Sequence, residues 1–492
     1  MGYLTIILGL PIIGLLVIAF LPKTNDKAIK YTALAFTLAA FILSVILFCQ
    51  FDRSIGSVGH IQFEEKISWI PAINAHYHLG VDGLSLPMVL LMTFLGFLSV
   101  LVSWKIDLRP REYFIWLLLL ETSILGVFCS LDLVLFFLFW ELELIPMYFL
   151  ISIWGGGRKE YSAIKYVLYT LTGSAMMLAG ILSVYFSTGS LDIIELAGAN
   201  FKPVIPFAAM FFLLFIGFAI KLPMFPFHTW LPDAHTDAPT AASVVLAGAL
   251  LKMGGYGMIR LCVSIMPDMA KVYAPVLCAL AIIGVLYGAG VTLRQTDLKR
   301  LIAYSSVSHM GYVLLGIFAL SEISITGATL QMFSHGIITG LLFAMVGVVY
   351  DKTHDRNIEN LGGLARKMRF IVVLFSIAGL ASLGLPGTSG FAAEFITFIG
   401  SFSSTLVAGI KIYTLLGVFG IVLTAGYILY MLQKVFYGPP QEKWENMPDA
   451  DQVEKIFTII FAAAILLVGV YPAILTDVIK LGIAPIIKLI GV

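Results

Sequence analysis

Long apolar segments separated by short polar ones run through the whole sequence. A helix of about 20 apolar residues spans a bilayer, and fourteen segments have roughly that length or more. They lie near residues 3–22, 30–50, 84–104, 113–130, 132–153, 163–187, 204–227, 239–262, 272–293, 300–320, 326–350, 370–403, 412–437 and 456–475. The pattern predicts an all-α integral membrane protein with about fourteen transmembrane helices, of which the twelfth is overlong and broken.

Two stretches outside these segments differ in character. Residues 51–83 are polar enough to form an extramembrane loop, and residues 476–491 are short and amphipathic, which predicts a helix at the membrane interface. The first apolar segment has no charged n-region and no small-residue cleavage site before Pro22. We therefore expect it to stay as a membrane helix and not to be a signal peptide.

The amino-acid composition further narrows the class of protein. Of the 492 residues 60% are hydrophobic and 12% charged, too few charges to cover the surface of a soluble globule. The net charge of +1 gives no basic field for nucleic acid. The four cysteines show no metal-ligand spacing, and there is no dinucleotide or phosphate-loop motif. The sequence therefore predicts no metal site and no cofactor in this chain.

Lysine and arginine are distributed unevenly between alternate loops. With the helices above, twenty fall on one side, eight on the other, and two, Lys221 and Lys252, lie within the membrane. Because cytoplasmic loops carry the excess of positive charge, both termini are predicted to lie outside.

Lys221 stands where the seventh helix must break. It ends an apolar run, and Pro223 and Pro226 follow it, each without an amide donor. An ionised lysine at the centre of a membrane helix costs roughly 2.5–3.5 kcal/mol, so it needs a partner. The alternative is a proline kink with Lys221 snorkelling to an interface.

Other ionisable residues follow Lys221. Lys252 lies a dozen residues into the next apolar segment, ahead of a glycine-rich second weak point at residues 253–257. Two buried lysines in adjacent interrupted helices suggest a proton path. The same stretch contains His228, and the loop expected between helices seven and eight carries Asp233, His235 and Asp237, which predict an acidic mouth that admits protons.

Carboxylates occur within the apolar segments as well. Glu141 is nine residues into one, and Glu143, two residues further, cannot share its helix face. Glu121, in the preceding segment, is a third candidate. As alternatives, Glu143 is a neutral carboxyl bonded to backbone, and Glu121 contacts a partner subunit.

The second half of the sequence repeats the first in outline. A break at Pro386 and Gly387 is followed by the buried carboxylate of Glu394, in the position that Lys221 takes in the first half. Paired broken helices indicate two inverted repeats, helices 4–8 and 9–13. His309 and His335 lie between the breaks, where they are either core residues or relay residues. The predicted divisions are 1–110, 111–262, 272–437 and 438–492.

Several motifs resemble a known family. They are Gly80-Val-Asp82-Gly-Leu-Ser85, Trp140-Glu141 with Pro146-Met-Tyr148, Lys221-Leu-Pro223 with Trp230-Leu-Pro-Asp-Ala-His235, Ala238-Pro-Thr240 with Leu250-Leu-Lys252, Ala303-Tyr-Ser-Ser-Val-Ser-His309, and Ala381-Ser-Leu-Gly-Leu-Pro386 with Glu394. Together they resemble the antiporter-like subunit M family (mitochondrial subunit 4) of respiratory complex I, the proton-pumping NADH:quinone oxidoreductase.

The resemblance implies roles for these residues. Glu141 is then the carboxylate paired with Lys221, Lys252 the central lysine, and Glu394 the replacement of a terminal lysine. His309 and His335 are relay residues. NADH, flavin, iron–sulfur clusters and quinone are expected mainly in other subunits. The expected partners are antiporter-like subunits L and N and the lipid bilayer of a bacterial cell membrane.

The sequence also leaves alternatives to a complex I subunit. A Mrp-type Na⁺/H⁺ antiporter subunit shares the broken-helix motifs. Glu141-Leu-Glu143 also resembles relatives of complex I that accept electrons from ferredoxin. A third possibility is a structural membrane scaffold, against which the buried charges argue.

Overall fold

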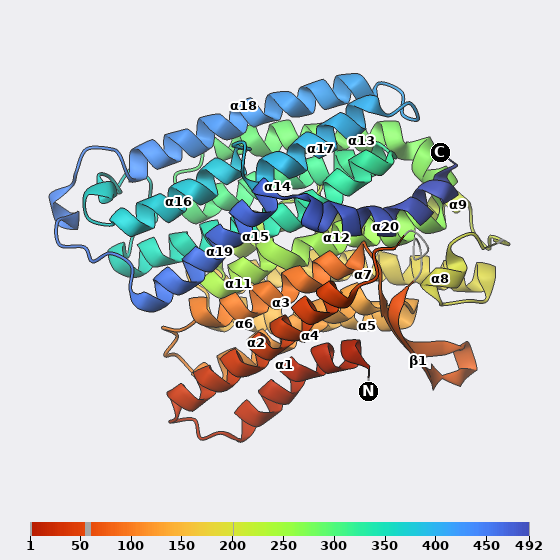
Figure 1. The fold of residues 1–492 in the computed structure, drawn as a ribbon, viewed down its shortest axis with the longest axis horizontal. Coiled ribbons are helices and arrows are strands. Elements are labelled where there is room, and N and C mark those ends of the chain that lie inside the picture. Colours follow the sequence, from red (N-terminus) through yellow and green to blue (C-terminus); the bar gives the residue numbers. More distant parts are fainter. Residues whose placement is uncertain (1, 55–60, 200, 492) are drawn as a thin grey trace.

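The computed structural model describes residues 2–54, 61–199 and 201–491, and helices that run side by side make up most of it (Figure 1). Within these residues, twelve helices are long and apolar enough to cross a membrane. They are α1 (Tyr3–Phe20), α2 (Asp26–Gln50), α3 (Ser85–Val102), α4 (Pro110–Cys129), α5 with α6 (Leu133–Trp154), α7 (Lys159–Thr188), the helix from α11 to η4 (Thr240–Val263), α13 (Pro267–Thr292), α14 (Leu298–Phe318), α15 (Glu322–Thr353), α18 (Ile410–Val435) and α19 (Gln452–Val470). The predicted class of helical membrane protein is confirmed.

Two further helices are interrupted where the sequence predicted breaks. The first consists of α9 (Phe207–Lys221) and α10 (Trp230–Asp237), and the second of α16 (Arg369–Ser382) and α17 (Ser389–Ser403). Gly384 and Gly387 adopt positive φ in the second break, a conformation that glycine adopts without strain. The count of fourteen stays a prediction, because it requires each interrupted pair to act as one span.

The segment with Asp233, His235 and Asp237 was wrongly predicted as a loop between helices seven and eight. It is α10, whose buried residues include His235 and Asp237. The polar side chains are satisfied by α7: Lys165 Nζ lies 2.7 Å from Asp233 Oδ2, and Ser162 donates to Asp237 Oδ2 at 2.6 Å. A polar helix is stable inside the bundle because its neighbour supplies these partners.

The helix that carries Lys252 is irregular on both sides of the lysine. It consists of α11 (Thr240–Val245), the π-helical η3 (Leu246–Leu250), α12 (Leu251–Gly257) and the π-helical η4 (Met258–Val263). The weak point predicted in the glycine-rich stretch is thus displaced to its flanks, and the glycines themselves are α-helical. We call this whole helix, residues 240–263, helix 8.

The segment between α2 and α3 is a β-hairpin, so the chain is not purely helical. Strands β1 (Gln62–Ile70) and β2 (Ala75–Val81) pair antiparallel around the short η2 (Pro71–Ile73). The hairpin projects at the end of the bundle where α8 (Ile193–Leu196) also lies (Figure 1). We call this the hairpin end.

The C-terminal helix α20 (Ala473–Ile490) is amphipathic, as predicted, but its apolar face packs on the protein. It contacts α3, α13 and α15, and Leu475, Val478 and Ile483 are buried. The exposed face carries Lys480 and Lys488.

Ten successive helices form two groups of five, and the fourth helix of each group is one of the interrupted helices. The first group begins with α4 and the second with α13. If each interrupted pair is one span, each group has an odd number of helices and the second group runs in the opposite direction, as an inverted repeat requires. Within the groups α7 packs along α9, and α15 along α17. The division into domains at particular residues stays a prediction.

Helix starts follow local capping rules. Asp132, Asp192 and Asp297 accept backbone N–H groups at the starts of α5, α8 and α14, and Asp451 forms a capping box with Glu454 at the start of α19. Short 3₁₀ turns, η5 (Leu364–Arg366) and η6 (Glu442–Trp444), lie in the connections at the end opposite the hairpin.

Candidate functional site

Lys221 lies in an ion pair inside the bundle. It is the last residue of α9, where Pro223 and Pro226 prevent the helix from continuing. Its Nζ contacts Glu143 Oε1, and the two side chains are 1% and 0% exposed. Tyr166 donates a hydrogen bond to Glu143 Oε2 at 2.5 Å. The snorkelling alternative is therefore wrong, because the lysine points into the protein toward a carboxylate.

Aromatic rings enclose this ion pair. The rings of Trp140 and Tyr166 lie with their centroids 5.4 Å from Lys221 Nζ. Such rings attract a cation and exclude water from it. We call Lys221, Glu143 and Tyr166 the lysine–carboxylate pair site.

The expected partner of Lys221, Glu141, does not occupy this site. Residues two apart on a helix point in nearly opposite directions, so only one of Glu141 and Glu143 can face α9. The structure has Glu143 there, at the interruption between α5 and α6. Glu141 is partly exposed, and its Oε1 has no hydrogen-bond partner among the described residues. The alternative of Glu143 bonded to backbone is wrong, because the side chains of Lys221 and Tyr166 are its partners.

Lys252 begins a second line of polar groups. Its Nζ donates to Ala247 O, a carbonyl of the π-helical η3, and lies 2.8 Å from His335 Nδ1. The His335 and His309 rings have centroids 5.6 Å apart. His309 Nδ1 lies 3.2 Å from Glu394 Oε1. We call Lys252, His335, His309 and Glu394 the central line.

Enclosed helices hold the central line. Helix 8, α14 and α15 are almost entirely buried, and they carry Lys252, His309 and His335 respectively. Both halves of the second interrupted helix contribute: Ser382, the last residue of α16, lies 3.2 Å from His309 Nε2, and Glu394 lies in α17. Glu394 is thus in the second half of its interrupted helix, whereas Lys221 ends the first half of its own. The predicted equivalence of the two positions is wrong in this respect.

Close helix packing joins the pair site to the central line. A Cβ on Gly254 of helix 8 would lie 2.7 Å from Leu222 N and Phe218 O. Only glycine permits this approach. The glycine predicted as a weak point therefore lets helix 8, which carries Lys252, pack directly on the break that follows Lys221.

The remaining candidates lie away from these two sites. Glu121 is 2% exposed and packs on Gly96 of α3, where a Cβ would lie 2.5 Å from either carboxylate oxygen. This burial does not favour the alternative in which Glu121 contacts a partner subunit. His228 is buried beside the rings of Phe225 and Tyr287, with centroids 5.8 and 5.1 Å away.

His235 is the one residue of the expected mouth that points toward neither solvent nor a polar partner. Its ring stacks on Phe343 with centroids 4.5 Å apart, and neither ring nitrogen has a hydrogen-bond partner in the described chain. Asp233 lies in ion pairs with Lys165 and Arg300 at the end opposite the hairpin. The three residues thus have separate surroundings and do not form one mouth.

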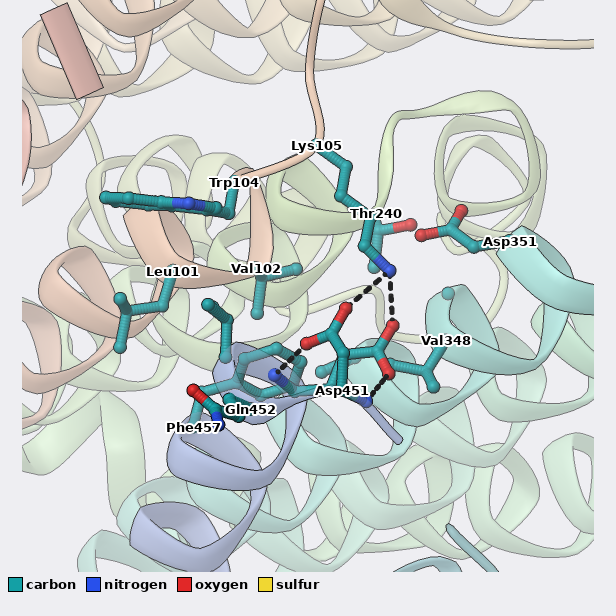
Figure 2. A pocket seen from close by; sticks show the side chains of 14 residues that line it. Leu101, Val102, Trp104, Lys105, Thr240, Val348, Asp351, Asp451, Gln452 and Phe457 are labelled. Carbon is teal, nitrogen blue, oxygen red and sulfur yellow. Dashed lines mark hydrogen bonds and ion pairs between the residues drawn. The ribbon is translucent and has the colours of Figure 1, made fainter. Parts of the chain in front are cut away.

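A cavity of about 280 Å³ lies beside the start of helix 8 (Figure 2). Thr240, the first residue of helix 8, lines it together with Asp351. Lys105 Nζ lies 2.8 Å from Asp451 Oδ2 and 2.6 Å from Glu454 Oε1. Burial lowers the pKa of Lys105, but its bonds to both carboxylates outweigh this and raise it overall. Asp237 lines a neighbouring cavity that shares Thr240 and Asp351.

Sequence reasoning missed Tyr166 and the charge pair between Asp82 and Arg260. Tyr166 carries no signal, since a tyrosine in an apolar helix is common and its partner is distant in sequence. Asp82 lies in one of the family motifs, and the structure pairs it with Arg260 at 2.6 Å. Arg260 at the end of an apolar segment was counted as a loop charge, although it is buried.

Known proteins resemble this chain over nearly its whole length. Residues 130–424 match the family described as NADH:quinone oxidoreductase/Mrp antiporter, TM. The chain is 41% identical to NADH-quinone oxidoreductase subunit M of Rhodobacter capsulatus, covering 99% of this chain and 96% of that protein. It is 43% identical to NAD(P)H-quinone oxidoreductase chain 4 1 of Synechococcus elongatus, covering 97% and 90%. A chain in the structure of respiratory complex I from Thermus thermophilus with bound NADH superposes with a TM-score of 0.88 at 29% identity, covering 99% and 100%.

Proposed function

Because the chain belongs to the family of NADH:quinone oxidoreductase and Mrp antiporter membrane subunits, we propose that it carries protons across the membrane as a subunit of a NADH:quinone oxidoreductase. The observation that carries this proposal is the central line. Four ionisable side chains from four different helices meet inside the bundle, each in contact with the next. Ionisable groups in membrane helices are costly, and a row of them is typical of a proton relay.

The chemistry of the central line suits a stepwise transfer. Lys252 Nζ donates a proton to His335 Nδ1, across 2.8 Å. His335 Nε2 then releases a proton on the other side of the ring, and it has no competing hydrogen-bond partner among the described residues. His309 takes this proton and passes one from Nδ1 to Glu394, 3.2 Å away. The histidines suit this role because a small change in surroundings moves their titration across neutral pH.

The lysine–carboxylate pair site acts as the switch. While Glu143 pairs with Lys221, the positive charge of Lys221 is compensated. When the pair opens, Lys221 becomes an uncompensated cation on the helix that packs against Gly254, next to Lys252. Its field then favours release of the proton from Lys252 toward His335, because like charges repel strongly in a medium of low dielectric constant. Closing the pair allows Lys252 to be reloaded.

The energy for opening the pair comes from redox chemistry outside this chain. We propose that NADH, flavin, iron–sulfur clusters and quinone bind mainly to partner subunits, and that antiporter-like subunits of the L and N types adjoin this one. The complex lies in the cell membrane of a bacterium. In the alternative of a ferredoxin-dependent relative, we propose the same central line with a different electron donor in the partner subunits.

Replacement of Lys221 by methionine tests the proposal. In proteoliposomes that contain the whole complex, Lys221→Met is expected to abolish most proton pumping while quinone reduction continues. Lys411→Met is the matched control, because Lys411 is exposed at the start of α18 and lies outside both sites. Wild-type pumping by an assembled Lys221→Met complex would refute the switch. Proton transport that depends on Na⁺ and proceeds without electron transfer would instead favour a Mrp-type antiporter.

A further inference from the structure

A second charge pair lies on helix 8, between Lys252 and the hairpin end. Arg260 of η4 contacts Asp82 Oδ1 at 2.6 Å, and the two residues are 8% and 6% exposed. Asp82 also accepts the backbone N–H groups of Leu84 and Ser85 at 3.0 Å, at the start of α3. The pair is therefore fixed between two helices and takes no part in the central line.

Tyr256 lies on helix 8 between this pair and Lys252. Lys252, Tyr256 and Arg260 are spaced four residues apart, which places them along one face of helix 8. Arg260 Nε donates to Tyr256 Oη at 3.3 Å, and Tyr256 donates to Phe128 O at 3.4 Å. The amino group of Lys252 reaches back along helix 8 to Ala247 O and across to His335 Nδ1. A row of polar side chains thus leads from Lys252 toward the hairpin end, but the lysine does not contact it.

Neither member of the pair can relay a proton. A guanidinium group stays protonated in proteins, so Arg260 has no proton to give up and no site to accept one. Burial raises the pKa of Asp82, but the charge of Arg260 and the bonds from the start of α3 outweigh this and lower it overall. Asp82 therefore stays ionised. A relay requires groups that alternately bind and release protons, and the row is interrupted here.

We propose that the Arg260–Asp82 pair is a proton barrier that closes the short route along helix 8 to the hairpin end and so directs protons from Lys252 into the central line. Fixed positive groups exclude protons in other membrane pores. Without this barrier, Tyr256 and Asp82 would offer Lys252 a direct exit, and the membrane would leak. The inference rests on the proposed function, because it takes Lys252 as the proton-exchanging lysine.

The test measures passive proton leak, without NADH or quinone. Proteoliposomes with the assembled complex receive a pH gradient, and its decay is followed with a pH-sensitive dye. Arg260→His places a titratable group opposite Asp82, and we expect the gradient to decay several-fold faster than in wild type. Arg260→Lys keeps a cation opposite Asp82 but one that can release its proton, so an intermediate decay is expected. Arg294→His, at an exposed position after α13, is the control.

A second substitution locates the leak. If the leak starts from Lys252, adding Lys252→Met to Arg260→His restores a stable gradient. The barrier is refuted if the assembled Arg260→His and Arg260→Lys complexes both hold the gradient as wild type does. It is also refuted if the leak persists in the Arg260→His and Lys252→Met double variant. These outcomes concern leak alone, so they are distinct from a failure of the pumping proposal, which is measured during turnover.

Discussion

The two buried lysines of this chain have opposite surroundings. Lys221 has a carboxylate partner, Glu143, that is held by Tyr166. Lys252 has only a backbone carbonyl and an imidazole nitrogen, with no carboxylate in contact among the described residues. A carboxylate holds a lysine in its charged form, whereas neutral acceptors allow the proton to leave. The difference supports the proposal that Lys221 acts as the charged switch and Lys252 as the proton-exchanging lysine.

The largest expected effect comes from breaking the pair on its acidic side. Glu143→Gln leaves Lys221 buried without a counter-charge, and removing one partner of a buried pair costs about 3–5 kcal/mol. We expect a lower thermal unfolding temperature of the complex and loss of most proton pumping. Glu141→Gln is the matched control and should have a much smaller effect on both. Equal loss of pumping in the two variants would show that Glu141 shares the role of partner.

Substitution of Glu394, at the far end of the central line, tests whether its carboxyl group binds and releases a proton. Glu394→Gln keeps the shape of the side chain but cannot bind and release a proton, so pumping should fall by roughly an order of magnitude or more. Glu394→Asp keeps the carboxylate and should retain part of the proton pumping. Proton and electron transfer are measured together in proteoliposomes. Full pumping by Glu394→Gln would place the exit elsewhere and leave Glu394 as a neutral carboxyl near the break.

A smaller effect is expected from a substitution that weakens the Lys221–Glu143 pair but keeps both of its partners. Tyr166→Phe removes the hydroxyl that donates to Glu143 at 2.5 Å. Loss of a hydrogen bond to a charged group costs about 1.5–3 kcal/mol, so the pair should open more readily and pumping should become partly uncoupled from electron transfer. Tyr169→Phe removes a comparable bond, to Thr229, outside the pair site. If both variants uncouple equally, the Tyr166 bond has no special role.

The hairpin end has a second buried cation site, in which the partner of the carboxylates is the histidine His78. His78 Nε2 lies 2.8 Å from Glu64 Oε1, and its Nδ1 lies 3.0 Å from Asp192 Oδ2. Burial lowers the pKa of His78, but its bonds to Asp192 and Glu64 outweigh this and raise it overall. The stabilisation is therefore fully present below the ordinary histidine pKa of about 6.5 and is lost as pH rises through the raised value.

Hydrogen exchange measures this smallest effect. After correction for the intrinsic rate, amide protection of β2 should decrease as the pH rises above the ordinary histidine range. His78→Gln should remove this pH dependence, and His76→Gln, on the same strand, should keep it. Protection that is independent of pH in the wild type would contradict a titrating His78.

Local signals in the sequence predicted most of the fold. Apolar length identifies the spans, and the prolines at 223, 226 and 386 identify both breaks, because these features act through the backbone itself. Helix α10 escaped prediction because its stability depends on α7, which supplies Ser162 and Lys165 to Asp237 and Asp233. The hairpin was read as a loop because its pairing within a polar segment leaves little periodic pattern.

The site was predicted in its residue types but not in its pairings. Lys252, His309, His335 and Glu394 stand out as ionisable groups in apolar segments, and the structure brings these four together. The choice between Glu141 and Glu143 depends on the rotation of a helix that is interrupted at Glu143, and no sequence pattern specifies that rotation. Burial of Arg260 likewise follows from its contact with Asp82, 178 residues away.

The central claim is that Lys252 exchanges the transported proton, and the number of protons pumped per electron pair tests it most directly. The measurement compares wild-type and Lys252→Met complexes in proteoliposomes, with quinone reduction followed in the same sample. The account predicts that quinone reduction continues in the Lys252→Met complex while fewer protons are pumped per electron pair. An unchanged ratio in the assembled variant would contradict it.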